Sequence, residues 1–197
     1  MSTLDFWFDY SCPYAYLAST QVEALARRAS ATLTWKPMLL GGVFRAVSTP
    51  QNLSQVLVPA KAKHNLEDMH RWADLFGVAL RMPAGHPLRT VEALRATLVV
   101  GIDPRVVHGF YRAYWVDNRA PSSEETMRDV LTSAGHDADA VLAKLDTTRE
   151  DLRRRTGDAV ALGIFGAPSY IVNGKDLFWG QDRMLFVENA LAATEWC

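Results

Sequence analysis

The sequence predicts an α/β protein in which a large helical block interrupts a small mixed sheet. Three observations indicate this class. The first forty residues read as strand, helix and strand; residues 41–163 carry mostly helical periodicity; residues 164–197 return to two short strands and a helix. We therefore expect one sheet domain built from residues 1–40 and 164–197, and a helical insertion domain formed by residues 41–163.

The opening segment fits one β-α-β unit. Residues 3–9 (TLDFWFD) alternate and are rich in aromatic side chains, as strands are. Pro13 lies where a helix can begin, and residues 14–29 repeat apolar side chains at helical spacing. Residues 31–39 (ATLTWKPML) are strand-like again, up to Pro37. The two strands should be parallel, with a right-handed crossover.

The middle of the chain predicts several helices. Residues 41–52 (GGVFRAVSTPQN) favour a loop, and residues 78–88 favour an extended segment because they contain two prolines and a glycine. Helical periodicity occurs in residues 59–77, 90–100, 104–118, 122–135 and 138–163. Two of these helices have clear start signals: Ser122 with Glu125 as a capping box, and Asp137.

The end of the chain predicts a hairpin and a last helix. Residues 164–180 hold two short strand patterns separated by NGKD, and Asn-Gly is a strong hairpin signal. Residues 181–196 then carry an amphipathic pattern. The order β-α-β, helical block, β-β-α predicts a thioredoxin-like sheet that is split by the insertion.

Composition excludes several classes of partner. Lysine and arginine number 21 against 22 aspartates and glutamates, so electrostatics favour neither nucleic acid nor an anionic membrane. The N-terminus lacks a secretory signal, and no apolar run is long enough to span a membrane. Two cysteines, Cys12 and Cys197, make no disulfide framework, which favours a cytoplasmic location. The histidines show no metal-binding spacing.

Cys12 is the first candidate for chemistry. It should lie at the N-terminus of the first helix, where unpaired N–H groups and the helix dipole stabilise an anion and lower the pKa of a thiol. The same donors can instead polarise the thiol of a bound ligand. The alternative is a buried apolar side chain, as most free cysteines are.

Two further segments near the chain's end are candidates. A cis bond before Pro168, in FGAPSYIV, would let the backbone of Ala167 pair with an extended thiol peptide; an ordinary edge-strand trans proline is the alternative. Gln181 and Asp182 should face outward where the last strand meets the last helix. Asp182 could cap that helix or accept hydrogen bonds from a ligand's ammonium group.

These segments combine into a family resemblance. FDYSCPYAYLA, PAKAKHNLEDMHRWADLFGVALRMP, GIFGAPSYIV and LFWGQDRM, in this order, resemble the glutathione transferase kappa and 2-hydroxychromene-2-carboxylate isomerase branch of the DsbA family. The resemblance covers essentially the whole chain. It implies a homodimeric enzyme that uses glutathione and a small-molecule substrate. In the isomerases, the glutathione thiolate adds reversibly to a conjugated α-keto acid, rotation follows, and elimination restores the conjugation.

The resemblance places Cys12 at the catalytic position. The isomerases and kappa transferases usually carry serine there, whose hydroxyl stabilises the thiolate of glutathione. Disulfide oxidoreductases carry cysteine there and a second cysteine where this chain has Ala15. The chain therefore departs from both patterns, and it cannot form an internal Cys-x-x-Cys disulfide.

The same resemblance implies residues that bind the two substrates. Lys61 and Asn52 would lie near the glycine carboxylate of glutathione, Ala167 before Pro168 would bond its cysteinyl backbone, and Gln181 and Asp182 would hold its γ-glutamyl end. Candidate walls for the second substrate are Phe44, Trp72, Met82, Arg89 and Trp179. Trp72 and Met82 fit an ordinary core, and Arg89 fits either a substrate carboxylate or a surface ion pair.

Two other functions stay open at this point. One is a monothiol oxidoreductase in which Cys12 forms a mixed disulfide that an external thiol resolves. The other is a catalytically weak thioredoxin-like binding module in which Cys12 only packs.

Overall fold

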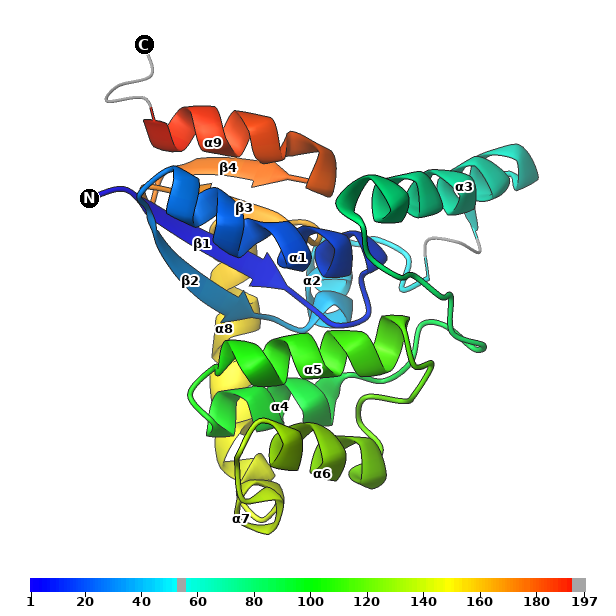
Figure 1. The fold of residues 1–197 in the computed structure, drawn as a ribbon, viewed down its shortest axis with the longest axis vertical. Coiled ribbons are helices and arrows are strands. Elements are labelled where there is room, and N and C mark those ends of the chain that lie inside the picture. Colours follow the sequence, from blue (N-terminus) through cyan, green and yellow to red (C-terminus); the bar gives the residue numbers. More distant parts are fainter. Residues whose placement is uncertain (53–55, 193–197) are drawn as a thin grey trace.

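A four-stranded mixed sheet forms the centre of the protein (Figure 1). The computed structural model describes residues 1–52 and 56–192. The strands are β1 (Thr3–Phe8), β2 (Thr32–Pro37), β3 (Ser169–Val172) and β4 (Asp176–Trp179), in the spatial order β2-β1-β3-β4. β1 is parallel to β2 and antiparallel to β3, and β3 is antiparallel to β4. This is the thioredoxin-like sheet that the sequence predicts.

Helices cover the sheet and fill the insertion. α1 (Pro13–Arg28) joins β1 to β2, and a 3₁₀ turn, η3 (Gln181–Arg183), leads from β4 into α9 (Met184–Ala192). The insertion contains α2 (Leu40–Ala46), α3 (Pro59–Phe76), α4 (Val91–Val99), α5 (Pro104–Trp115), α6 (Glu124–Ser133), α7 (Ala138–Leu142), η2 (Leu145–Thr148) and α8 (Arg149–Ala161). In Figure 1, α3 projects to one side, whereas α4–α7 form a bundle below the sheet. None of the helices in the described ranges is long and apolar enough to cross a membrane.

Aromatic side chains join the sheet to the insertion. The Phe6 ring in β1 lies 5.2 Å from the Trp35 ring in β2 and 5.5 Å from the Tyr170 ring in β3, so three strands share one cluster. The Phe8 ring then lies 5.9 Å from the Tyr111 ring in α5. Because buried aromatic rings contribute much of a core's apolar area, the insertion and the sheet are stabilised together.

The hairpin between β3 and β4 forms where Asn-Gly predicts it. Asn173 and Gly174 both have positive φ, 52° and 70°, as a tight hairpin turn of this handedness requires. The Lys175 N–H closes the turn by donating to the Val172 carbonyl at 3.0 Å. Gly174 supplies the positive φ without a steric cost.

Two local predictions were wrong. The segment after β2 is the helix α2 rather than a loop, and the Asp9 carboxylate accepts a hydrogen bond from its first N–H, at Leu40. The cap of α6 is Ser123, whose hydroxyl accepts from the Thr126 N–H, instead of Ser122. The Ser122 hydroxyl lies one residue earlier and accepts from the N–H of Ala93 in α4. The predicted cap at Asp137 is confirmed, with the Ala140 N–H as donor.

Asp9 ties the end of β1 to the insertion. Its side chain is buried, and one carboxylate oxygen accepts from the Ser11 N–H at 3.0 Å, the Ser11 hydroxyl at 3.1 Å and the Thr90 hydroxyl at 2.8 Å. The other oxygen accepts from the Leu40 N–H at 2.8 Å. Burial raises the pKa of Asp9, and these four hydrogen bonds act in the opposite direction by stabilising the carboxylate.

Replacing Asp9 with alanine should therefore destabilise the fold strongly. The change leaves buried donors unpaired, and we expect a loss of roughly 3–5 kcal/mol in the free energy of unfolding. Urea denaturation measures this loss. The matched control is Asp5→Ala in the same strand, where the Asp5–Lys36 pair is partly exposed at 3.4 Å and should contribute about 1 kcal/mol or less. Equal losses in the two variants would contradict the role of Asp9.

Candidate active site around Cys12

Cys12 is the N-cap residue of α1. Its backbone is extended, with φ −97° and ψ 116°, and Pro13 begins the helix. The Cys12 N–H donates to the Asp9 carbonyl at 3.2 Å, and the Cys12 carbonyl accepts from the Tyr16 N–H at 3.0 Å. These bonds fix the thiol at the end of the helix where backbone N–H groups are free to point at an anion.

The thiol meets the loop that precedes β3. The Cys12 Sγ lies 3.0 Å from the Ala167 carbonyl oxygen and donates a hydrogen bond to it, across a separation of 155 residues. The peptide bond between Ala167 and Pro168 is cis, as the sequence predicts. The Ala167 N–H donates to no residue in the described part of the chain. The two halves of the sheet domain therefore meet at this thiol.

The expected lowering of the Cys12 pKa is wrong. Burial raises the pKa of Cys12 to about 12, and the negative charge of Asp9 raises it further. The N–H groups of Ala15 and Tyr14 do point at the sulfur and lower the pKa, but burial is the larger effect. In this state the thiol is protonated at neutral pH and acts as a hydrogen-bond donor.

Gln181 and Asp182 lie next to α1, in η3, and they differ in exposure. Gln181 is buried, so the expectation that it faces outward is wrong, whereas Asp182 is exposed and its carboxylate pairs with Arg183 at 2.8 Å. η3 packs directly against α1. Gly180 has φ 109°, and a side chain there would clash with the Asp182 carboxylate, so only glycine permits this turn.

Two tyrosines that sequence reasoning missed, Tyr14 and Tyr170, interact electrostatically with both Cys12 and Asp182. Burial, Asp182 and then Cys12 raise the pKa of Tyr170, whose buried hydroxyl has no partner among the described residues. Burial, Asp68, Cys12 and Asp182 raise the pKa of Tyr14 to about 12. Both phenols therefore lie within electrostatic range of the thiol and of the Asp182 carboxylate. The sequence signal that could have identified Tyr14 as a neighbour of the thiol is its position, two residues after Cys12.

An exposed aromatic pair borders the cis-proline loop. The rings of Phe165 and Trp179 lie 5.2 Å apart, and both side chains are about half exposed. Trp179 lies so close to Gly166 that a Cβ there would come within 2.6 Å of the indole nitrogen. Trp179 was a predicted pocket residue, whereas Phe165 was missed, although Phe-Gly directly precedes Ala-Pro in the sequence.

The remaining predicted site residues belong to the insertion. Lys61 is exposed in the first turn of α3. Asn52 is partly buried in the segment before α3. The Phe44 side chain, in α2, is buried. The Arg89 guanidinium forms an ion pair with the Glu92 carboxylate at 2.6 Å. The structure therefore gathers Cys12, Ala167, Pro168, Gln181, Asp182 and Trp179, and within the described residues no contact joins Lys61 or Arg89 to this group.

Trp72 packs against Phe76 in α3, at 5.3 Å between rings. Cys197 lies outside the described residues. Within the described ranges, no group of three or more histidine, cysteine, aspartate or glutamate side chains could hold a metal ion.

The sheet order, the N-terminal thiol and the cis-proline loop define a thioredoxin-fold protein with a helical insertion. The family model of the DSBA-like thioredoxin domain matches residues 3–192. The chain belongs to this family.

Relatives of similar length confirm the resemblance seen in the motifs. A 2-hydroxychromene-2-carboxylate isomerase from Sphingobium xenophagum is 29% identical over 193 residues, which cover 96% of this chain and 97% of the relative. Glutathione S-transferase kappa 1 from Caenorhabditis elegans is 23% identical, over 95% of this chain and 90% of its own. A solved structure of a 2-hydroxychromene-2-carboxylate isomerase superposes with a TM-score of 0.86 at 25% identity, covering 96% of this chain and 94% of that one.

The buried thiol predicts slow alkylation. In a Cys197→Ser background, the rate at which iodoacetamide modifies Cys12 should keep rising between about pH 6 and about pH 10, because the thiolate fraction rises throughout this range. Mass spectrometry follows the reaction, and Cys12→Ser in the same background is the control. A plateau near neutral pH would show that the thiol is already ionised there.

Proposed function

We propose that this protein is a glutathione-dependent isomerase of the 2-hydroxychromene-2-carboxylate isomerase type. The full-length relatives support this reaction class. The observation that carries the proposal is the Cys12 thiol, which donates to the Ala167 carbonyl at 3.0 Å beside the free N–H groups of a helix N-terminus. When its single S–H turns from the Ala167 carbonyl to a bound thiolate, this protonated donor can do for the thiolate what a serine hydroxyl does.

The residues around Cys12 fit a γ-glutamyl tripeptide. The Ala167 N–H and carbonyl offer one donor and one acceptor to an extended backbone, as at the edge of a sheet. Asp182 is exposed and can accept from an ammonium group, and the buried Gln181 packs beside it. We propose that Ala167 and Pro168 bind the cysteinyl part of glutathione, and that Gln181 and Asp182 bind its γ-glutamyl end.

Lys61 and Asn52 complete the proposed glutathione site at the glycine carboxylate. Lys61 is exposed and forms no ion pair within the described residues, so its ammonium group is available to an anion. Lys63, two residues later, already pairs with Glu67 at 3.8 Å. This difference favours Lys61 over its neighbour as the carboxylate ligand.

Cys12 acts in this proposal as a donor and not as the nucleophile. Bound glutathione supplies the nucleophilic thiol that adds reversibly to a conjugated substrate and allows rotation about the former double bond. The Cys12 S–H and the N–H groups of Tyr14 and Ala15 stabilise negative charge on a sulfur placed beside them. Monothiol exchange is disfavoured, since the pKa of Cys12 is raised to about 12 and Ala15 replaces a resolving cysteine.

Trp179 and Phe165 are the proposed wall for the second substrate. Their half-exposed rings border the loop that holds Ala167, so an aromatic substrate can stack there next to the sulfur. Phe44 is largely buried and can contribute little surface to this wall. A homodimer and a cytoplasmic location, by resemblance and cysteine content, belong to the same proposal.

Replacing Cys12 tests the reaction. Cys12→Ser should keep isomerisation of 2-hydroxychromene-2-carboxylate within about tenfold of the parent, because serine is also a donor. Cys12→Ala should lose about 100-fold, because the donor is gone. The measurement is the absorbance change of the substrate with and without glutathione. Equal losses in both variants, or activity that ignores glutathione, would contradict the proposal.

Glutathione affinity tests the proposed clamp. Asp182→Asn and Lys61→Ala should each raise the Kd for glutathione about tenfold, because each removes a charge-assisted contact. The matched controls are Arg183→Gln, which removes only the neighbour of Asp182, and Lys63→Ala. Calorimetry measures the Kd. Weakening by the controls to the same degree would indicate a general charge effect.

A further inference from the structure

A cleft lies in the helical insertion, and none of the residues around the Cys12 thiol lines it. It has a volume of about 510 Å³, the size of a small-molecule site. Its walls come from α4 and the residue Arg89 before it, from the end of α7, from η2, and from the start of α8. The lining residues are Arg89, Glu92, Arg95, Leu142, Ala143, Leu145, Asp146 and Arg149. None of them belongs to the proposed glutathione clamp.

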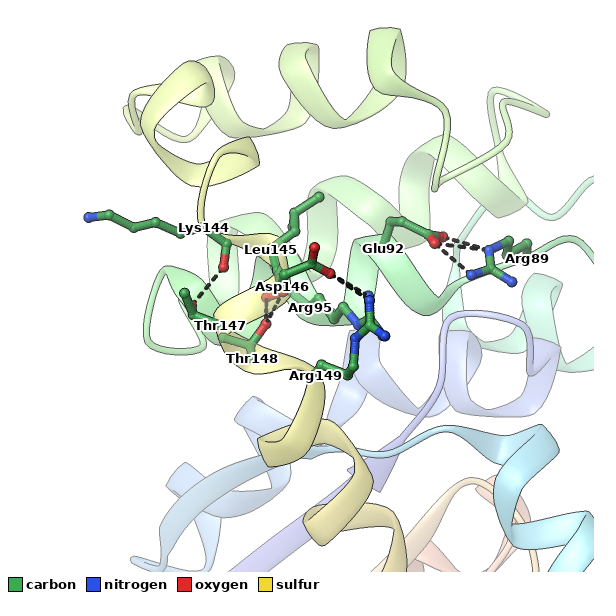
Figure 2. A network of polar contacts seen from close by, with 9 residues as sticks. All are labelled: Arg89, Glu92, Arg95, Lys144, Leu145, Asp146, Thr147, Thr148 and Arg149. Carbon is green, nitrogen blue, oxygen red and sulfur yellow. Dashed lines mark hydrogen bonds and ion pairs between the residues drawn. The ribbon is translucent and has the colours of Figure 1, made fainter.

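The cleft carries more positive than negative charge. Arg89 and Glu92 neutralise each other in a forked pair, with contacts of 2.6–3.0 Å. Asp146 is left as the partner of two arginines: it lies 2.9 Å from the Arg149 guanidinium and 3.5 Å from that of Arg95. Figure 2 shows both guanidinium groups facing this one carboxylate. One cation in the cleft therefore lacks its own counter-charge among the described residues.

Arg95 is the cation that is poorly satisfied. Its side chain is only 16% exposed, whereas Asp146 is 80% exposed and reaches Arg95 through a single long contact. The Arg95 Nε is buried and donates to no described residue. A buried guanidinium usually has its donors paired, because an unpaired buried charge is costly. The Arg95 Nε is thus unsatisfied, and the only ion-pair contact of this guanidinium within the described residues is the long one to Asp146.

We propose that this cleft binds the carboxylate of a small organic acid, with Arg95 and Arg149 as the anchoring cations. A carboxylate matches the planar fork of a guanidinium. Leu142 and Leu145 form an apolar wall next to the arginines, which favours an acid with an apolar body over inorganic phosphate. Asp146 is exposed, so it can swing away from the arginines at little cost when the acid binds.

Calorimetric titration with benzoate tests the site, at ionic strength held constant with chloride. We expect saturable binding at millimolar concentrations, and about tenfold weaker binding in Arg149→Gln and in Arg95→Gln. Arg153→Gln is the matched control, because Arg153 lies in the same helix, is exposed, pairs with Glu150 and lines no part of the cleft. Urea unfolding shows that each variant is folded. Arg149 is itself exposed, which keeps the test valid if Arg95→Gln does not fold.

Three results would overturn the proposal. They are an absence of saturable benzoate binding, equal weakening by Arg153→Gln, and phosphate binding as tight as that of benzoate, which would indicate charge attraction alone. Glutathione affinity provides the final comparison. Arg149→Gln should leave the Kd for glutathione unchanged, so the proposal for the cleft and the proposal for the thiol site can be contradicted separately.

Discussion

The buried carboxylate of Asp9 holds the turn before Cys12 and the helical insertion in one arrangement. Its four hydrogen bonds reach Ser11, the first residue of α2, and Thr90 just before α4. Each bond satisfies a group that would be costly to leave unpaired in the interior. Next to it, the Trp115 indole donates to the Tyr10 carbonyl at 2.8 Å. The insertion therefore supports the loop that carries the thiol and is more than a cover for the sheet.

The state of the thiol follows from two opposed effects. A helix N-terminus offers N–H groups that favour a thiolate, and Cys12 receives them from Tyr14 and Ala15. Burial removes water from the same sulfur, and the charge of Asp9 opposes a second negative charge nearby. Burial is the larger effect, so the carbonyl of Ala167 receives a proton donor and not an anion. This balance makes a cysteine behave much as a serine would.

The sequence predicts correctly those features that depend only on neighbouring residues. The positive φ at Asn173 and Gly174, the Pro13 helix start and the Asp137 cap follow from neighbouring residues, and the structure confirms them. The meeting of Cys12 with Ala167 also followed, because the order of elements fixes which loops face each other. Features that depend on contacts between distant parts of the chain could not be predicted from these patterns. The α2 helix begins where a distant carboxylate accepts its first N–H, and the burial that raises the pKa of Cys12 depends on the packed core.

The contact between Cys12 and Ala167 also has a consequence for synthesis of the chain. The two residues are 155 positions apart, and the whole insertion is made between them. The first β-α-β segment leaves the ribosome with a sheet that still lacks β3 and β4, so a row of β1 backbone groups awaits its partner. Until β3 has been translated, the nascent chain has no contact between Cys12 and Ala167, and the β1 edge that pairs with β3 stays open.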